Sequence, residues 1–247
     1  MLHAFARNKS RAYRRYLGVR DPSEPRVSAE DEITSLIFGP LEFLSTLDNW
    51  TLWKLVVRSR TSISACGPLP SNFFSDFSPS SFTVEFWPRK ENIEPDLVVQ
   101  FVDDVGATRS LLIELKWDAG VSGADQLEKQ WLRYQESEHD RSLHVFIAKR
   151  APEMVSDTTP WTCLEADGSE AVRLRAIRWH EFKQEIAKLS HASTVSAPLK
   201  RWAVLVSDFL GQLEVRPFVG FRAVIHLAEA IPPMDGQDIV LWRHGEK

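Results

Sequence analysis

The segment 94–117, EPDLVVQFVDDVGATRSLLIELKW, constrains the fold of this chain more than any other part of the sequence. It contains two apolar runs, 96–101 and 110–117, with the turn-forming residues 103–106 between them. Apolar runs of this length, separated by a turn rich in Asp and Gly, predict a β-hairpin. The charged residues in these runs are therefore expected in a largely covered sheet, where a charge is costly unless it has a partner or a function.

Two carboxylates and a lysine are predicted to lie close together in this hairpin. Side chains alternate along a strand, so Glu114 and Lys116 share one face and Leu115 points to the other. A hairpin with residue 105 at its midpoint places Asp96 opposite Glu114, with Cβ atoms about 4.5–5.5 Å apart. Two carboxylates at that distance repel unless a cation joins them, and hard oxygen ligands suit Mg²⁺ or Mn²⁺.

The predicted chemistry is hydrolysis of a phosphodiester bond. Asp96, Glu114 and the backbone carbonyl of Leu115 are the expected metal ligands, and the metal would neutralise charge that develops on the phosphate. Lys116 is expected to position the attacking water and to help deprotonate it.

These residues resemble the PD-(D/E)xK nuclease superfamily, whose core is the restriction-endonuclease-like fold. The match consists of Pro95-Asp96, then Glu114-Leu115-Lys116, then a predicted helix over 122–138. In that helix Gln130 and Tyr134 form a Q-x-x-x-Y pattern, which is similar to the branch containing recombination nucleases and phage exonucleases. The resemblance covers about residues 30–149.

The resemblance also implies roles for residues outside the hairpin. It places Gln130 with the catalytic residues, near the metal and a substrate phosphate. Gln126 and Tyr134 lie on the same helix face and are expected to bind substrate. The superfamily often takes a further acid from a helix before the sheet, and Glu30 is the candidate metal ligand because it shares a stripe with apolar residues of that helix. Products with 5′-phosphate and 3′-hydroxyl ends are implied as well.

The order of the predicted elements indicates an α/β protein with a mixed central sheet flanked by helices, and the resemblance implies that this core is restriction-endonuclease-like. The predicted organisation is a basic N-terminal arm (1–27), a nuclease core (28–190) and a C-terminal helical and strand extension packed on the core (191–247). The expected helices are 28–41, with a kink or end at Gly39-Pro40, and 47–57, 122–138, 181–189 and 197–213. The expected strands are 82–87, 96–101, 110–117, 143–148, 172–179 and 238–242.

The N-terminal arm is strongly basic. The first twenty residues contain six Lys and Arg and no acid, so the other 227 carry a net charge of −10 against −4 for the whole chain. Phosphates favour clustered cations, so Arg11, Arg14 and Arg15 are predicted to contact the nucleic-acid backbone, and Tyr13 and Tyr16 are suited to stack on bases. The alternatives are a solvated terminus and a helix that docks on a partner protein.

Composition excludes several other classes of protein. With 43% hydrophobic and 26% charged residues, the chain is neither disordered nor a coiled coil. Two distant cysteines cannot form a zinc cage or a disulfide framework. No secretory signal and no apolar run of about 18–20 residues are present, so the expectation is a soluble cytoplasmic protein with no membrane partner.

The sequence therefore predicts a metal-dependent nuclease that acts on nucleic acid, with DNA favoured over RNA as the substrate. Phage defence or DNA repair is the suggested context. A partner protein or a homo-oligomer is compatible with this prediction. One alternative is a catalytically silent module of the same fold that recruits a partner, and another is an RNA-directed nuclease. A purely structural interpretation makes Asp96 a turn cap, Glu114 and Lys116 an exposed ion pair, and the glutamines an ordinary polar helix face.

Overall fold

The computed structural model describes residues 2, 5, 12–17, 19, 29–58, 73–117, 125–134, 141–151, 154 and 174–215. Its centre is a five-stranded sheet with the strands in chain order, β1-β2-β3-β4-β5. The strands are β1 (Pro79–Phe86), β2 (Leu97–Asp103), β3 (Thr108–Lys116), β4 (Ser142–Ala148) and β5 (Leu174–Arg178). The pairs β1–β2 and β2–β3 are antiparallel, whereas β3–β4 and β4–β5 are parallel. The predicted α/β class with a mixed sheet is confirmed.

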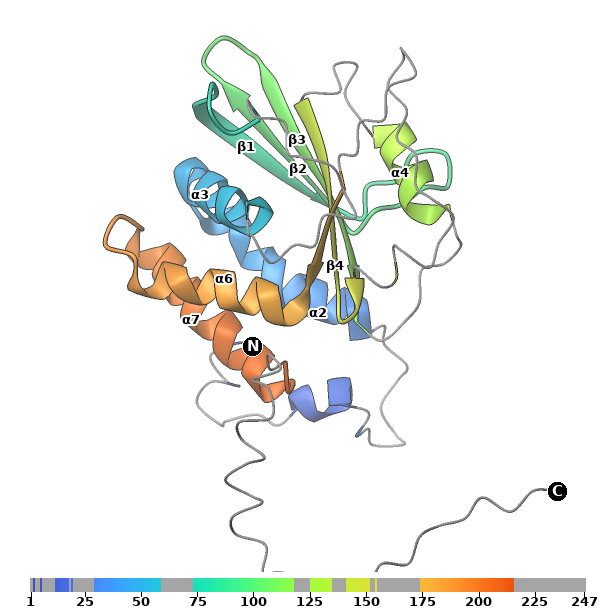
Figure 1. Cartoon of the computed structure of the whole chain (residues 1–247), viewed down its shortest axis with the longest axis vertical. Coiled ribbons are helices and arrows are strands. Elements are labelled where there is room, and N and C mark those ends of the chain that lie inside the picture. Colours follow the sequence, from blue (N-terminus) through green and yellow to red (C-terminus); the bar gives the residue numbers. More distant parts are fainter. Residues whose placement is uncertain are drawn as a thin grey trace, which may run out of the picture. The chain divides into compact units, whose positions relative to one another are not determined.

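The predicted β2–β3 hairpin forms in the predicted register. Leu97 pairs with Ile113, so residues 96 and 114 are the next pair along the two strands. The side chain of Asp103 closes the turn, since its Oδ1 accepts hydrogen bonds from the amides of Val105 and Ala107. In Figure 1 this turn lies at the upper end of the sheet, and the carboxyl ends of β3 and β4 lie at the lower end.

The helices divide between the two faces of the sheet (Figure 1). On one face lie α2 (Ala29–Phe38), α3 (Thr46–Val57), α6 (Trp179–His191) and α7 (Ala197–Gln212), and α4 (Gln126–Tyr134) lies on the other. Two 3₁₀ helices complete the described elements, η1 (Ala12–Leu17) and η2 (Gly39–Phe43). The expected change at Gly39-Pro40 is present, because α2 gives way to η2 there.

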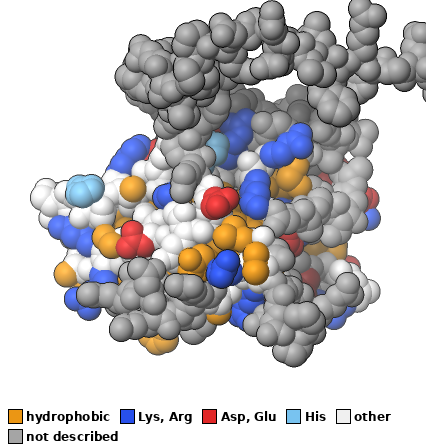
Figure 2. Space-filling view, turned by 90° about the horizontal axis from the view of Figure 1, so that it is seen from below, with side chains coloured by type: hydrophobic (Ala, Val, Ile, Leu, Met, Phe, Trp, Pro, Cys, Tyr) orange, Lys and Arg blue, Asp and Glu red, His pale blue; other side chains and the backbone are white. Residues whose placement is uncertain are grey.

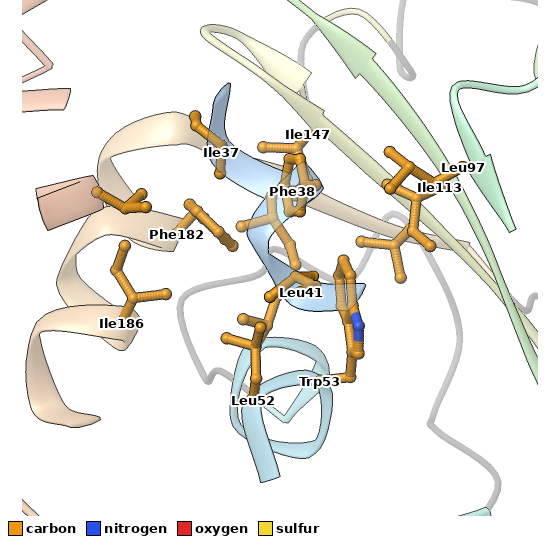
Figure 3. Close-up of a cluster of buried hydrophobic side chains, with 14 of the residues drawn as sticks. Ile37, Phe38, Leu41, Leu52, Trp53, Leu97, Ile113, Ile147, Phe182 and Ile186 are labelled. Carbon is orange, nitrogen blue, oxygen red and sulfur yellow. The ribbon is translucent and has the colours of Figure 1, made fainter. Parts of the chain in front are cut away.

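Apolar side chains of α2, α3 and α6 pack on the sheet to form the main core (Figure 3), and α7 packs against α6. Phe38 and Trp53 stack with ring centroids 5.9 Å apart, and Phe182 from α6 lies 5.8 Å from Phe38. A smaller core between the sheet and α4 contains Leu127 and Phe146. Every residue of β4 is buried, as is typical of a strand with parallel neighbours and both faces covered.

The described residues up to Val215 belong to one compact unit. Helix α7 belongs to this unit and packs against α6. The strand expected at 238–242 and most of the arm lie outside the described residues. Among the helices that the structure describes, none combines the length and apolarity needed to cross a membrane.

Candidate active site

Asp96, Glu114 and Lys116 meet at the lower end of the sheet, where β2 begins and β3 ends. The backbone amide of Leu115 donates a 2.6 Å hydrogen bond to Oδ2 of Asp96, so the Asp96 side chain reaches across to β3. Glu114 and Lys116 are only 2% and 9% exposed. The structure therefore excludes an exposed Glu114–Lys116 ion pair, and it places both charges in the covered part of the sheet.

Three hydrogen-bond donors surround the buried carboxylate of Glu114. The Lys116 ammonium and the Gln126 amide lie 2.8 and 2.7 Å from Oε1, and the Gln130 amide lies 2.8 Å from Oε2. Both glutamines come from α4, where residues four apart share a face. A buried carboxylate is tolerated only when it is paired and hydrogen-bonded, so this α4 face holds Glu114 in place.

Lys116 lies between carboxylates from two elements. Its Nζ is 2.8 Å from Glu114 Oε1 and 3.7 Å from Oε2 of Glu30, which α2 supplies. Burial acts to lower the pKa of Lys116, but the negative charges of Glu114, Glu30 and Asp96 outweigh it and raise that pKa above its ordinary value. Lys116 is therefore a cation that donates hydrogen bonds, and these surroundings do not favour the expected role in deprotonating water.

The surroundings of Asp96 favour its neutral, protonated form, whereas those of Lys116 favour the charged form. Burial, and then the nearby charge of Glu114, raises its pKa from 3.8 to about 8, although the Leu115 amide and Lys116 act against the shift. A carboxylate with such a pKa holds a proton at neutral pH unless another cation takes its place. A cation shared by Asp96 and Glu114 would remove the repulsion that causes the shift.

Glu30 reaches the site from α2, in the place that its helical periodicity predicts. Its Oε1 accepts a 2.8 Å hydrogen bond from the backbone amide of Trp117, the residue after β3. Its other carboxylate oxygen faces Lys116. Glu30 therefore links the first turn of α2 to the end of β3.

The oxygen donors around Asp96 suit a hard divalent cation, although no metal cluster is preformed. Within the described parts of the chain, no three His, Cys, Asp or Glu side chains are close enough together to hold a metal ion. In a strand the N–H and C=O of one residue point to the same side, so the Leu115 carbonyl faces the Asp96 side of β3. Two carboxylates and this carbonyl form the type of donor set that Mg²⁺ and Mn²⁺ prefer.

Tyr134 is not brought to the carboxylates. Its hydroxyl lies 2.6 Å from the Pro88 carbonyl and 3.0 Å from the Ile93 carbonyl, both in the connection between β1 and β2. The ammonium of Lys90, in the same connection, lies 4.6 Å from the centre of the Tyr134 ring. Tyr134 thus fixes the end of α4 to the segment that leads into Asp96.

The basic arm contacts the same end of the sheet through η1. The Tyr16 carbonyl accepts a 3.3 Å hydrogen bond from Trp117 Nε1, and the Tyr16 hydroxyl donates to Glu32 at 2.7 Å. Arg15 forms an ion pair with Glu32 at 2.5 Å, so this arginine already has a protein partner. Tyr16 is 4% exposed and therefore unavailable for stacking on bases as the sequence suggested.

The structure distinguishes the remaining predicted contacts of the arm. Arg14 is exposed on η1, whereas Arg11 lies outside the described residues. Burial, together with the hydrogen bond to Glu32, raises the pKa of Tyr16 to about 12. The arm is thus anchored by contacts that the charge pattern alone does not predict.

Figure 2 views the molecule from below and shows acidic, basic and hydrophobic side chains close to one another on this side. Comparison of the chain with protein-family models, with curated proteins and with solved structures gives no match. The function is therefore inferred from the geometry of the site.

Proposed function

We propose that this chain is a Mg²⁺- or Mn²⁺-dependent nuclease with a restriction-endonuclease-like core that hydrolyses phosphodiester bonds, DNA being the preferred substrate. The observation that carries the proposal is the convergence of Asp96 and Glu114 at the end of one hairpin, with Lys116 on the same strand. Glu30 from α2 and two glutamines from α4 complete the group. Burying several charged groups together costs free energy, so their presence here favours a functional role.

Asp96, Glu114 and the Leu115 carbonyl are the groups that would hold the metal, and Glu30 is the further candidate ligand. The bound cation would stabilise negative charge on the phosphate and lower the pKa of a bound water molecule. Gln126 and Gln130 keep the Glu114 carboxylate oriented. Such preorganisation matters because a site loosened by about 1 Å loses much of its activity.

Lys116 contributes a positive charge and three N–H donors at the reactive position. Since its pKa is raised by the surrounding carboxylates, it orients water or a phosphate oxygen as a cation. A fixed cation of this kind stabilises the charge that develops as the phosphodiester is cleaved. Lys116→Ala is accordingly expected to abolish cleavage.

A catalytically silent recruitment module is the second candidate. One observation favours it: the Lys116 ammonium already pairs with both Glu114 and Glu30, so these charges are balanced within the protein itself. The raised pKa of Asp96 favours the nuclease, because a silent module gains nothing from a destabilised carboxylate.

A cleavage assay tests the proposal. Plasmid, linear duplex, single-stranded DNA and single-stranded RNA are each incubated with wild type and Mg²⁺ or Mn²⁺, and with EDTA. The variants are Lys116→Ala, Asp96→Asn and, as a matched control, Lys188→Ala, which removes a lysine paired with Glu185 on α6. Metal-dependent cleavage that survives only in wild type and Lys188→Ala is the expected result.

Cleavage retained by folded Lys116→Ala or Asp96→Asn would refute the assignment of these residues. Cleavage of RNA with no cleavage of DNA would support the proposed phosphodiester hydrolysis and show that RNA, not DNA, is the substrate. If wild type cleaves none of the four nucleic acids with either metal, the recruitment module becomes the better account.

A further inference from the structure

An exposed lysine lies beside the candidate active site on the neighbouring strand. The parallel register of β3 and β4 pairs Lys116 with Ala148, so Trp117 and Lys149 follow side by side. The Lys149 ammonium lies 4.4 Å from the centre of the Trp117 ring. A cation at this distance over an indole is attracted by the negative face of the ring.

Trp117 is a rigid support for this lysine. The residue is 3% exposed, and both of its N–H groups are engaged, the amide with Glu30 and the indole with the Tyr16 carbonyl. Its ring also packs edge-on against Trp179 at 5.6 Å. Lys149, the residue after β4, is therefore held beside Trp117 at the end of the sheet where β3 ends, and its side chain is exposed.

Other exposed cations lie at the same end of the sheet. Arg150 follows Lys149 directly, and Arg14 is on η1, two residues before the Tyr16 carbonyl that binds Trp117. Figure 2 shows Lys and Arg side chains on this side of the molecule. Residues 21–247 carry a net charge of −10, so a polyanion can bind only where cations are concentrated locally.

We propose that Lys149, supported by Trp117, binds a backbone phosphate of the nucleic acid next to the phosphodiester that is cleaved. This inference rests on the proposed nuclease function and adds a substrate-binding residue to it. Nucleic acid extends beyond the reactive bond with a regular series of phosphates, so a cation just outside the site meets one of them. Contacts of this type position the strand without recognising its sequence.

Binding and cleavage by the full chain together test the inference. The probe is a fluorescein-labelled single-stranded DNA of about 20 nucleotides, and anisotropy in EDTA gives the Kd over a range of KCl concentrations. The variants are Lys149→Ala and Lys149→Arg. Lys188→Ala is the control, because it removes the same charge from a residue nine positions along α6, about 14 Å from the start of that helix.

Lys149→Ala is expected to weaken binding roughly fivefold and to reduce the slope of log Kd against log salt by about 1. KM for cleavage rises by a similar factor while kcat stays within about twofold, because the reacting atoms are untouched. Lys149→Arg and Lys188→Ala are expected to stay near wild type.

Equal affinity and equal salt slope for Lys149→Ala and Lys188→Ala would overturn the inference and leave the nuclease proposal intact if wild type cleaves. A wild-type chain that neither binds nor cleaves the probe would overturn both. The two failures are thus distinguishable in one set of experiments.

Discussion

Replacing Asp96 by Asn is expected to stabilise the metal-free protein at neutral and alkaline pH while removing activity. Burial and Glu114 raise the pKa of Asp96 from 3.8 to about 8 in the folded state. Above about pH 4 the folded protein therefore binds more protons at this position than the unfolded chain. The wild type loses stability as pH rises from about 4 to about 8, and Asn, which carries no charge, does not.

The magnitude of this loss of stability follows from the pKa shift of Asp96. About three pH units lie between the ordinary pKa of 3.8 and pH 7, and at about 1.4 kcal/mol each they give a loss of about 4 kcal/mol. For a chain of this size that corresponds to roughly 10 °C in Tm. Asn keeps an oxygen that can accept the Leu115 amide, so the hydrogen bond seen at 2.6 Å can be retained.

Urea and thermal unfolding of both proteins in EDTA, between about pH 4 and pH 8, measure this difference. Asp96→Ala is the matched variant, because it also removes the charge but loses the acceptor, and it should show the same loss of pH dependence at lower overall stability. The electrostatic explanation would be refuted if wild type and Asp96→Asn had the same free energy of unfolding at pH 8. It would also be refuted if the stability of wild type increased relative to that of Asp96→Asn as pH rises.

Three further substitutions test separate parts of the structure. Gln130→Ala leaves Oε2 of buried Glu114 without its 2.8 Å donor and should cost about 1–3 kcal/mol in urea unfolding; no loss would contradict the network. Tyr134→Phe removes the hydroxyl that fixes α4, so it should lower the free energy of unfolding by about 1 kcal/mol and reduce kcat. A change in KM alone would instead indicate that Tyr134 binds substrate. Trp53→Ala removes a buried ring stacked on Phe38 and should cost about 3–5 kcal/mol by denaturation, and a loss below 1 kcal/mol would contradict the core packing.

The sequence predicts the part of the site that depends on local geometry. The turn at 103–106 fixes the register of the hairpin, and that register alone places Asp96 beside Glu114. Helical periodicity likewise identifies Glu30, since the other residues on its stripe are buried in the core. These predictions need no knowledge of how distant parts of the chain meet.

Features that depend on tertiary contacts cannot be predicted from the sequence. The mixed sheet is predicted, but the sequence does not tell which residues of β3 and β4 lie side by side, so the contact of Lys149 with Trp117 is not predictable. The direction of the Lys116 pKa shift depends on how many carboxylates converge on it, and these come from three elements. The hydrogen-bond partners of Tyr134 lie more than 40 residues away in the β1–β2 connection, so the helix pattern alone does not predict that Tyr134 anchors α4.

Titration of the protein with Mn²⁺, by calorimetry at about pH 7.5, tests most directly whether Asp96 and Glu114 form a metal site. Wild type is expected to bind Mn²⁺ saturably, with protons released because Asp96 loses its proton. Asp96→Asn is expected to lose that binding, while Lys188→Ala binds as wild type does. Mn²⁺ binding that is the same in wild type and Asp96→Asn, or absent from both, would show that Asp96 and Glu114 do not form a metal site.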